Sequence, residues 1–173
     1  MRHVPATLSA AIVAGLSACG AGPQGGTHAL AVSIQGVSTA EVGSFQAAVL
    51  REGSRYDCAA VQARCLRDQV DDEALVPVLG PDGDWRPAVR FEAAPTPDAP
   101  SGTEVQDVEV QVAVGDDYAL VVEALSRSEP PTFLGGVCTY LRNEVVEGPN
   151  APVLTYLLEL RPEPLSCDPR IDP

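Results

Sequence analysis

The clearest hydrophobic pattern in the chain is a strict alternation from residue 108 to residue 114. Valine occupies every second position, and Glu109, Gln111 and Ala113 lie between the valines. A period of two places alternate side chains on opposite faces of a β-strand, so this segment predicts a half-buried strand. Gly115-Asp116-Asp117 then predicts a turn, and residues 118–124 predict a second strand with Tyr118, Leu120, Val122 and Ala124 on one face.

Other apolar runs between turn signals predict six further short strands. They span Ala29–Ile34, Ser44–Arg51, Leu75–Leu79, Trp85–Ala93, Cys138–Val146 and Ala151–Leu160. Residues 80–84 are a strong turn signal, so the third and fourth of these are expected to form a hairpin, with Pro77 at a sheet edge. Residues 147–150 are expected to join the last two as a final pair. The prolines of residues 94–102 are interpreted as a crossover within one domain.

Eight short strands at fairly even spacing predict an all-β fold, a single antiparallel β-sandwich. The piece Gly115-Asp116-Asp117-Tyr118-Ala119-Leu120 adds detail, because a tyrosine there follows a turn and opens a buried strand. It is similar to the tyrosine corner of immunoglobulin-like and transthyretin-like sandwiches. That resemblance implies a structural tyrosine whose hydroxyl binds a nearby backbone group.

The start of the chain has a different character. Arg2 precedes an apolar stretch, and Leu16-Ser17-Ala18-Cys19 follows. This resembles the type II signal peptide and lipobox of bacterial lipoproteins. The resemblance implies that residues 1–18 are removed, that Cys19 is lipidated, and that the protein hangs from a membrane by acyl chains. Only fifteen residues separate His3 from Cys19, too few for a membrane span. An ordinary secretory peptide is the alternative.

The resulting organisation has three parts: a signal peptide (1–18), a lipidated cysteine with a flexible tether (19–27) and a β-sandwich domain (28–173). In some bacteria an Asp after the lipidated cysteine retains the protein at the inner membrane. Gly20 stands there, so a lipid anchor in the outer membrane of the cell envelope is favoured.

Four cysteines remain after Cys19, an even number that suits an oxidising compartment. Cys58 and Cys65 lie about 10.5 Å apart if one helix joins them, beyond the roughly 7 Å that a disulfide spans. Either the segment is an irregular loop closed by Cys58–Cys65, with Cys138–Cys167 as the second bond, or it is helical and each cysteine reaches elsewhere. The first pairing is favoured. A four-thiolate metal site is a weak alternative without paired CxxC spacing.

The charge balance limits the partners. Eleven arginines face 24 acidic residues, a net charge of −13, and there is no lysine. This balance repels phosphate backbones, so no nucleic-acid partner is expected. It also disfavours docking on anionic lipid headgroups.

Candidate chemistry is sparse, and no cofactor or metal ion is predicted. His28 is interpreted as an ordinary residue at the start of the first strand, and the missing lysine excludes Schiff-base and Ser-Lys mechanisms. Three acidic groups remain, which are interpreted mainly as turn residues, with calcium binding or carboxylate catalysis as alternatives. They are Asp71-Asp72-Glu73, Asp82 with Asp84, and Asp116-Asp117. Trp85 is interpreted as a core residue rather than an exposed binding aromatic.

The sequence therefore predicts a non-enzymatic, lipid-anchored envelope module that acts in binding or scaffolding, with a protein or glycan as its partner. Two other functions are weighed against it: a carboxylate-based hydrolase that depends on Asp82 or Asp116, and a calcium-dependent adhesion domain.

Overall fold

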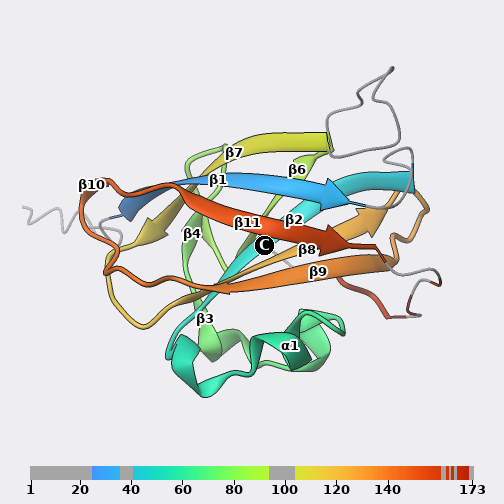
Figure 1. Cartoon of the computed structure of the whole chain (residues 1–173), viewed down its shortest axis with the longest axis horizontal. Coiled ribbons are helices and arrows are strands. Elements are labelled where there is room, and N and C mark those ends of the chain that lie inside the picture. The colour runs from blue at the N-terminus through green and yellow to red at the C-terminus, as the bar shows by residue number, and fades with distance from the viewer. Residues whose placement is uncertain are drawn as a thin grey trace, which may run out of the picture.

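The computed structural model describes residues 25–35, 41–93, 104–160, 163, 165 and 167–171. In this part of the chain two β-sheets pack face to face (Figure 1), which confirms the predicted all-β sandwich. The predicted signal peptide, Cys19 and most of the tether lie outside the described residues. None of the helices in the described part has the length and apolar character needed to cross a membrane.

The first sheet, sheet A, is built around the long strand β1. Its order is β10 (Gly148–Pro149), β1 (Gly25–Gln35), β7 (Glu104–Ala113), β4 (Val78–Leu79) and β5 (Trp85–Arg86), and β11 (Val153–Glu159) also pairs with β1. The second sheet, sheet B, has the order β3 (Leu75–Val76), β2 (Val42–Leu50), β8 (Ala119–Ser126) and β9 (Phe133–Tyr140), and β6 (Ala88–Glu92) also pairs with β2. All of these pairs are antiparallel except those of β10 and β11 with β1, which are parallel.

Alternation in the central strands produces two hydrophobic cores. Val110 and Val112 of β7 face Val122 of β8 in the core between the sheets, while Glu109 and Gln111 point to solvent. The opposite face of sheet B is also apolar, and there Leu50 and Val121 belong to a second core. Strand β8 is consequently buried along almost its whole length.

A helical segment, residues 53–74, covers the outer face of sheet B and is called the cap below. It contains α1 (Cys58–Val61) and three short 3-10 helices, η2 (Gly53–Arg55), η3 (Leu66–Asp68) and η4 (Asp72–Ala74). Asp57 begins α1, because its side chain accepts a hydrogen bond from the amide of Ala59 at 3.0 Å. Figure 1 shows the cap in green at one side of the sandwich. Residues 167–171, called the tail, add Ile171 to the same core.

The predicted hairpin between residues 75–79 and 85–93 is only partly correct. Strands β4 and β5 do form a short hairpin in sheet A, but β3 and β6 pair with β2 in sheet B. The chain therefore changes sheets at Pro77 and again at Pro87. Because proline cannot donate a ladder hydrogen bond, it suits the corner where a strand leaves one sheet for the other.

The predicted pairing of residues 138–146 with 151–160 is wrong. Strand β9 starts at Phe133 and pairs with β8 in sheet B, whereas β11 pairs with β1 in sheet A. Gly135 and Gly136 lie inside β9 and do not end it. At Gly136 an added Cβ would lie 3.3 Å from the carbonyl oxygen of Gln62, so the glycine allows the end of α1 to approach the strand.

The tyrosine corner has the geometry that its resemblance implies. The Tyr118 hydroxyl donates a hydrogen bond to the carbonyl of Val114 at 3.2 Å, and the ring packs against the central core. Its ring also lies over Gly115, where an added Cβ would meet the hydroxyl oxygen at 2.1 Å. A side chain at residue 115 is thus excluded by the tyrosine.

The favoured disulfide pairing is wrong, and the helical alternative is the one that the structure contains. Cys58 bonds to Cys138 of β9, and Cys65 bonds to Cys167 of the tail. The segment is helical at Cys58, so the two cysteines of the cap diverge toward different elements. The bonds join residues 80 and 102 positions apart and hold the cap at both ends.

Candidate functional site

Strands β9 and β11, at the edges of the two sheets, lie side by side (Figure 1). Residues of both strands line a cleft. Its volume is about 760 Å³. Two continuous stretches form most of its walls, residues 136–144 along β9 and residues 150–154 leading into β11, and His28 and Gln62 complete it. In the described part of the chain β9 pairs along its length with β8, apart from a single bridge between Phe133 and Leu165, and β11 pairs with β1. The cleft therefore runs along two strand edges.

His28 is the buried polar group of this cleft. It lies on β1 opposite Val110, a residue of the central core, so its side chain points into the sandwich. Only 6% of His28 is exposed, and neither ring nitrogen makes a hydrogen bond of normal geometry. Burial lowers the pKa of His28, and a backbone contact with Ala151 that falls outside normal hydrogen-bond geometry opposes the shift. At neutral pH the ring is therefore an uncharged imidazole with one donor and one acceptor nitrogen.

Polar side chains on the cap side of the cleft are already engaged. Gln62 Oε1 accepts a hydrogen bond from the amide of Cys138 at 3.4 Å. The Tyr140 hydroxyl accepts from the amide of Cys58 at 3.2 Å and donates to the carbonyl of Tyr56. These contacts fix the end of α1 against the second half of β9.

The opposite wall is held by a side-chain amide. Asn150 accepts from the amide of Val146 at 3.0 Å and donates to the carbonyl of the same residue at 2.9 Å. The Asn150 side chain thus makes the pair of hydrogen bonds with Val146 that a neighbouring strand would make. The loop between these walls carries Arg142 and Glu144, both exposed, so the rim holds one charge of each sign.

A second polar cluster lies on the outer face of sheet B, under the cap and the tail. Glu123 is 2% exposed and accepts hydrogen bonds from the amide of Leu66 at 2.7 Å and from Gln46 Nε2 at 3.0 Å. Burial raises the pKa of Glu123 to about 7, and the two hydrogen bonds oppose the rise. The same Gln46 donates to the carbonyl of Pro169 at 2.8 Å and accepts from the amide of Ile171 at 3.1 Å.

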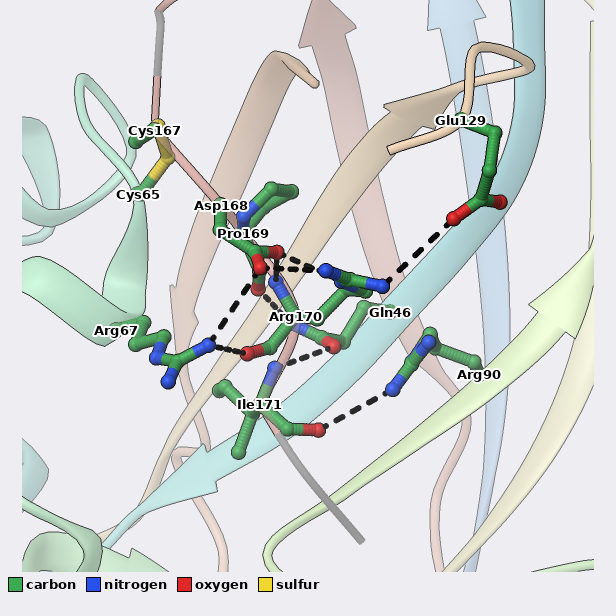
Figure 2. Close-up of polar contacts among 10 residues, drawn as sticks. All are labelled: Gln46, Cys65, Arg67, Arg90, Glu129, Cys167, Asp168, Pro169, Arg170 and Ile171. Carbon is green, nitrogen blue, oxygen red and sulfur yellow. Dashed lines mark hydrogen bonds and ion pairs between the residues drawn. A yellow bond between two sulfur atoms is a disulfide. The ribbon is translucent and has the colours of Figure 1, made fainter. Parts of the chain in front are cut away.

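Ion pairs and hydrogen bonds of exposed side chains also hold the tail in place (Figure 2). Asp168 pairs with Arg170 at 2.7 Å, which holds the pKa of that carboxyl well below its usual range, and Arg67 of the cap donates to the Arg170 carbonyl at 2.8 Å. Every buried polar group of Gln46 and Glu123 has a partner, so this cluster holds the tail and the cap on the sheet.

The predicted acidic groups are dispersed; Asp82 makes the local hydrogen bond of a turn residue, whereas Asp117 makes a long-range contact with the cap. Asp82 accepts from the amide of Asp84 at 3.3 Å and pairs with Arg86. Asp117 binds the amide and the hydroxyl of Ser54 at 2.9 and 2.8 Å, fixing the start of the cap to the turn before β8. The third group, residues 71–73, is exposed around η4.

No acidic group gathers ligands for a metal ion among the described residues. There, the one set of three close metal-ligating side chains is Cys65, Asp68 and Cys167, and both of these cysteines are in a disulfide. Trp85 is half-buried on the short strand β5 and belongs to neither core, so the prediction of a core position is wrong.

Sequence reasoning missed Glu123, Gln46 and the burial of His28. Glu123 interrupts the apolar run 119–125, and a charge in a strand covered on both faces was the available signal. His28 gave no such signal, because a histidine that opens a strand is unremarkable until the strand's inner face is known. The chain matches no protein-family model, and it shows no significant similarity to a curated protein or to a solved structure.

Proposed function

We propose that this chain is a lipid-anchored binding module of the bacterial cell envelope, attached through Cys19 and binding its partner in the cleft between β9 and β11. The observation that carries the binding role is the buried, unpartnered His28 in an open cleft. A buried polar group without a partner costs about 1–3 kcal/mol, which a ligand with the complementary group recovers on binding.

The anchor rests on the four lipobox positions before Gly20. Two disulfides within the domain support export to an oxidising compartment. The acyl chains of a lipoprotein cysteine, each buried methylene contributing about 0.8 kcal/mol, would hold the module at the membrane without a spanning helix. We favour the outer membrane because the residue after Cys19 is not Asp.

A binding role is favoured over catalysis by the composition of the cleft. The described side chains that line it include no serine, no lysine and no free thiol, since Cys138 is bonded to Cys58. The carboxylates on which a hydrolase would depend, Asp82 and Asp116, are not among its lining residues.

Metabolic labelling tests the anchor. The full chain is expressed in a bacterium with an alkyne fatty acid, beside the matched variant Cys19→Ala. We expect label on the wild type alone, with wild type in the membrane fraction and the variant released. Equal absence of label from both proteins, with both soluble in the periplasm, would overturn the anchor and establish ordinary secretion.

The competing functions have their own readouts. Turnover of glycan, ester or peptide substrates that is lost in Asp82→Asn or Asp116→Asn without a loss of stability would establish the hydrolase instead. Heat released on calorimetric titration with millimolar calcium would establish the adhesion domain.

A further inference from the structure

The outer edge of β9 offers a backbone donor in the cleft. The amide of Cys138 points away from β8, because it donates to Gln62 Oε1 at 3.4 Å. This is a long hydrogen bond, and its acceptor is a side-chain amide on the cap. Gln62 thus stands where the carbonyl of an added strand would lie, and a better-placed carbonyl could displace it.

His28 offers the second attachment point. Its neutral ring presents one donor and one acceptor to the cleft, and neither makes a hydrogen bond of normal geometry. A peptide group also carries one donor and one acceptor. A free carboxylate or ammonium group would match only one of the two nitrogens and would lose its hydration on entering.

Exposed apolar side chains flank these polar groups. Tyr140 at the end of β9 is 45% exposed, and Leu154 on β11 is 53% exposed. Both line the cleft. In strand addition, main-chain hydrogen bonds give affinity and apolar contacts with alternate side chains give specificity, so the cleft has both kinds of contact.

Charge limits the ligand further. The rim residues Arg142 and Glu144 balance one another, so the cleft itself favours an uncharged segment. The chain as a whole carries −13, which repels acidic partners and speeds association with basic ones.

From these observations we infer that the cleft binds an extended, uncharged peptide segment of a partner protein, which adds to the edge of β9 and hydrogen-bonds to His28. This inference rests on the binding role of the proposed function and not on the lipid anchor. If fatty-acid labelling fails, the peptide-binding inference is unaffected. If peptide binding fails, the proposed lipid anchor is unaffected.

The test is selection from a display library of random twelve-residue peptides on the purified full-length protein in detergent. Enriched peptides are counter-selected against Leu154→Lys, which places a charge in the cleft. Val114→Lys is the matched control, because Val114 is another exposed apolar residue, at 42%, and does not line the cleft. We expect peptides of alternating polar and apolar residues without acids, whose affinity is at least tenfold weaker for Leu154→Lys and unchanged for Val114→Lys.

The NMR resonance of His28 reports directly on whether a selected peptide binds beside this residue. The chain has two histidines, His3 and His28, and cleavage of the signal peptide leaves His28 as the one imidazole. With ¹³C-labelled histidine, we expect the His28 resonance to shift on titration with a selected peptide. We expect His28→Leu to weaken that peptide at least tenfold, while its circular dichroism matches wild type. Gln62→Ala is a second variant, for which affinity is retained or rises because the edge amide is freed.

Three outcomes would overturn the inference. They are a selection without enriched peptides, enriched peptides that bind Leu154→Lys and wild type equally, and a His28 resonance that responds to tetra-N-acetylchitotetraose but not to any selected peptide. The last would make the cleft a glycan site.

Discussion

The outer face of sheet B and the cleft between β9 and β11 differ in how the structure treats buried polar groups. On the outer face, under the cap and the tail, Glu123 and Gln46 are fully hydrogen-bonded and the covering segments are joined by disulfides. Between the sheets beside β9, His28 of β1 is almost as deeply buried, yet neither of its nitrogens makes a hydrogen bond of normal geometry and the space around it is open. The buried hydrogen-bonding groups of the first region have partners within the chain, whereas the ring nitrogens of His28 lack well-formed hydrogen bonds.

This difference separates a structural polar cluster from a candidate binding site. Burial alone does not distinguish Glu123 from His28, since both are almost inaccessible. The two residues differ in how fully their side chains are hydrogen-bonded. A cluster complete within the chain stabilises one conformation, whereas an incomplete one in an open cleft costs stability that a ligand can recover.

Removal of the Cys65–Cys167 bond is expected to have the largest effect on the covered side. Because Cys58–Cys138 stays intact, the loop that Cys65–Cys167 closes in the unfolded chain is about 36 residues long, and the chain-entropy account gives it about 4 kcal/mol. We expect Cys65→Ala with Cys167→Ala to lower the free energy of unfolding by about that amount, measured by urea titration of Trp85 fluorescence. Retention of wild-type stability would show that the tail needs no covalent attachment.

Glu123 is expected to make stability depend on pH. Its pKa is about 7 in the folded protein and 4.5 in an unfolded chain. Its contribution is fully present below pH 4.5 and is lost as pH rises through 7, because the folded protein then holds a buried charge. The loss amounts to about 3 kcal/mol at most.

The matched variant Glu123→Gln isolates this contribution from that of the other acids. We expect the stability difference between wild type and variant to change by up to about 3 kcal/mol between pH 4.5 and about pH 8, with wild type relatively weaker at the higher pH. A difference that is constant over this range would contradict the raised pKa.

His28→Leu is expected to stabilise the protein while it weakens binding. Leucine fills a similar volume and removes two unpartnered nitrogens, so the free energy of unfolding should rise by about 1–3 kcal/mol. Thermal unfolding at neutral pH measures it. A loss of stability would mean that His28 has a structural role.

The tyrosine corner should give the smallest effect. Tyr118→Phe removes one hydrogen bond, to the carbonyl of Val114, and leaves the packing of the ring. We expect a loss of about 1 kcal/mol without any change in peptide affinity. An effect on affinity would show that the turn before β8 is coupled to the cleft.

Local patterns predicted the sandwich because its central strands are amphipathic. The alternation in β7 and the inward face of β8 follow directly from the positions of valine and leucine, and the tyrosine corner follows from the turn before it. The cap was harder to predict, since Cys58 and Cys65 are close in sequence but contact elements 80 and 102 residues away.

Sheet membership could not be predicted from neighbouring segments. Pro77 and Pro87 both lie inside predicted strands, and nothing local states that the strand halves on either side join different sheets. The cleft depends on the same long-range information, because it arises where β9 and β11, expected to pair, end up in separate sheets.

The state of His28 in the free protein tests the central claim most directly. A pH titration of its imidazole resonance, in protein labelled with ¹³C-histidine, measures the pKa of this one group. If His28 is buried and unpartnered, its pKa lies below the ordinary value of 6.5 and moves when a selected peptide is bound. A pKa at or above 6.5 that no peptide changes would mean that the ring is solvated or paired within the protein. That result would contradict the proposal that the cleft is a binding site.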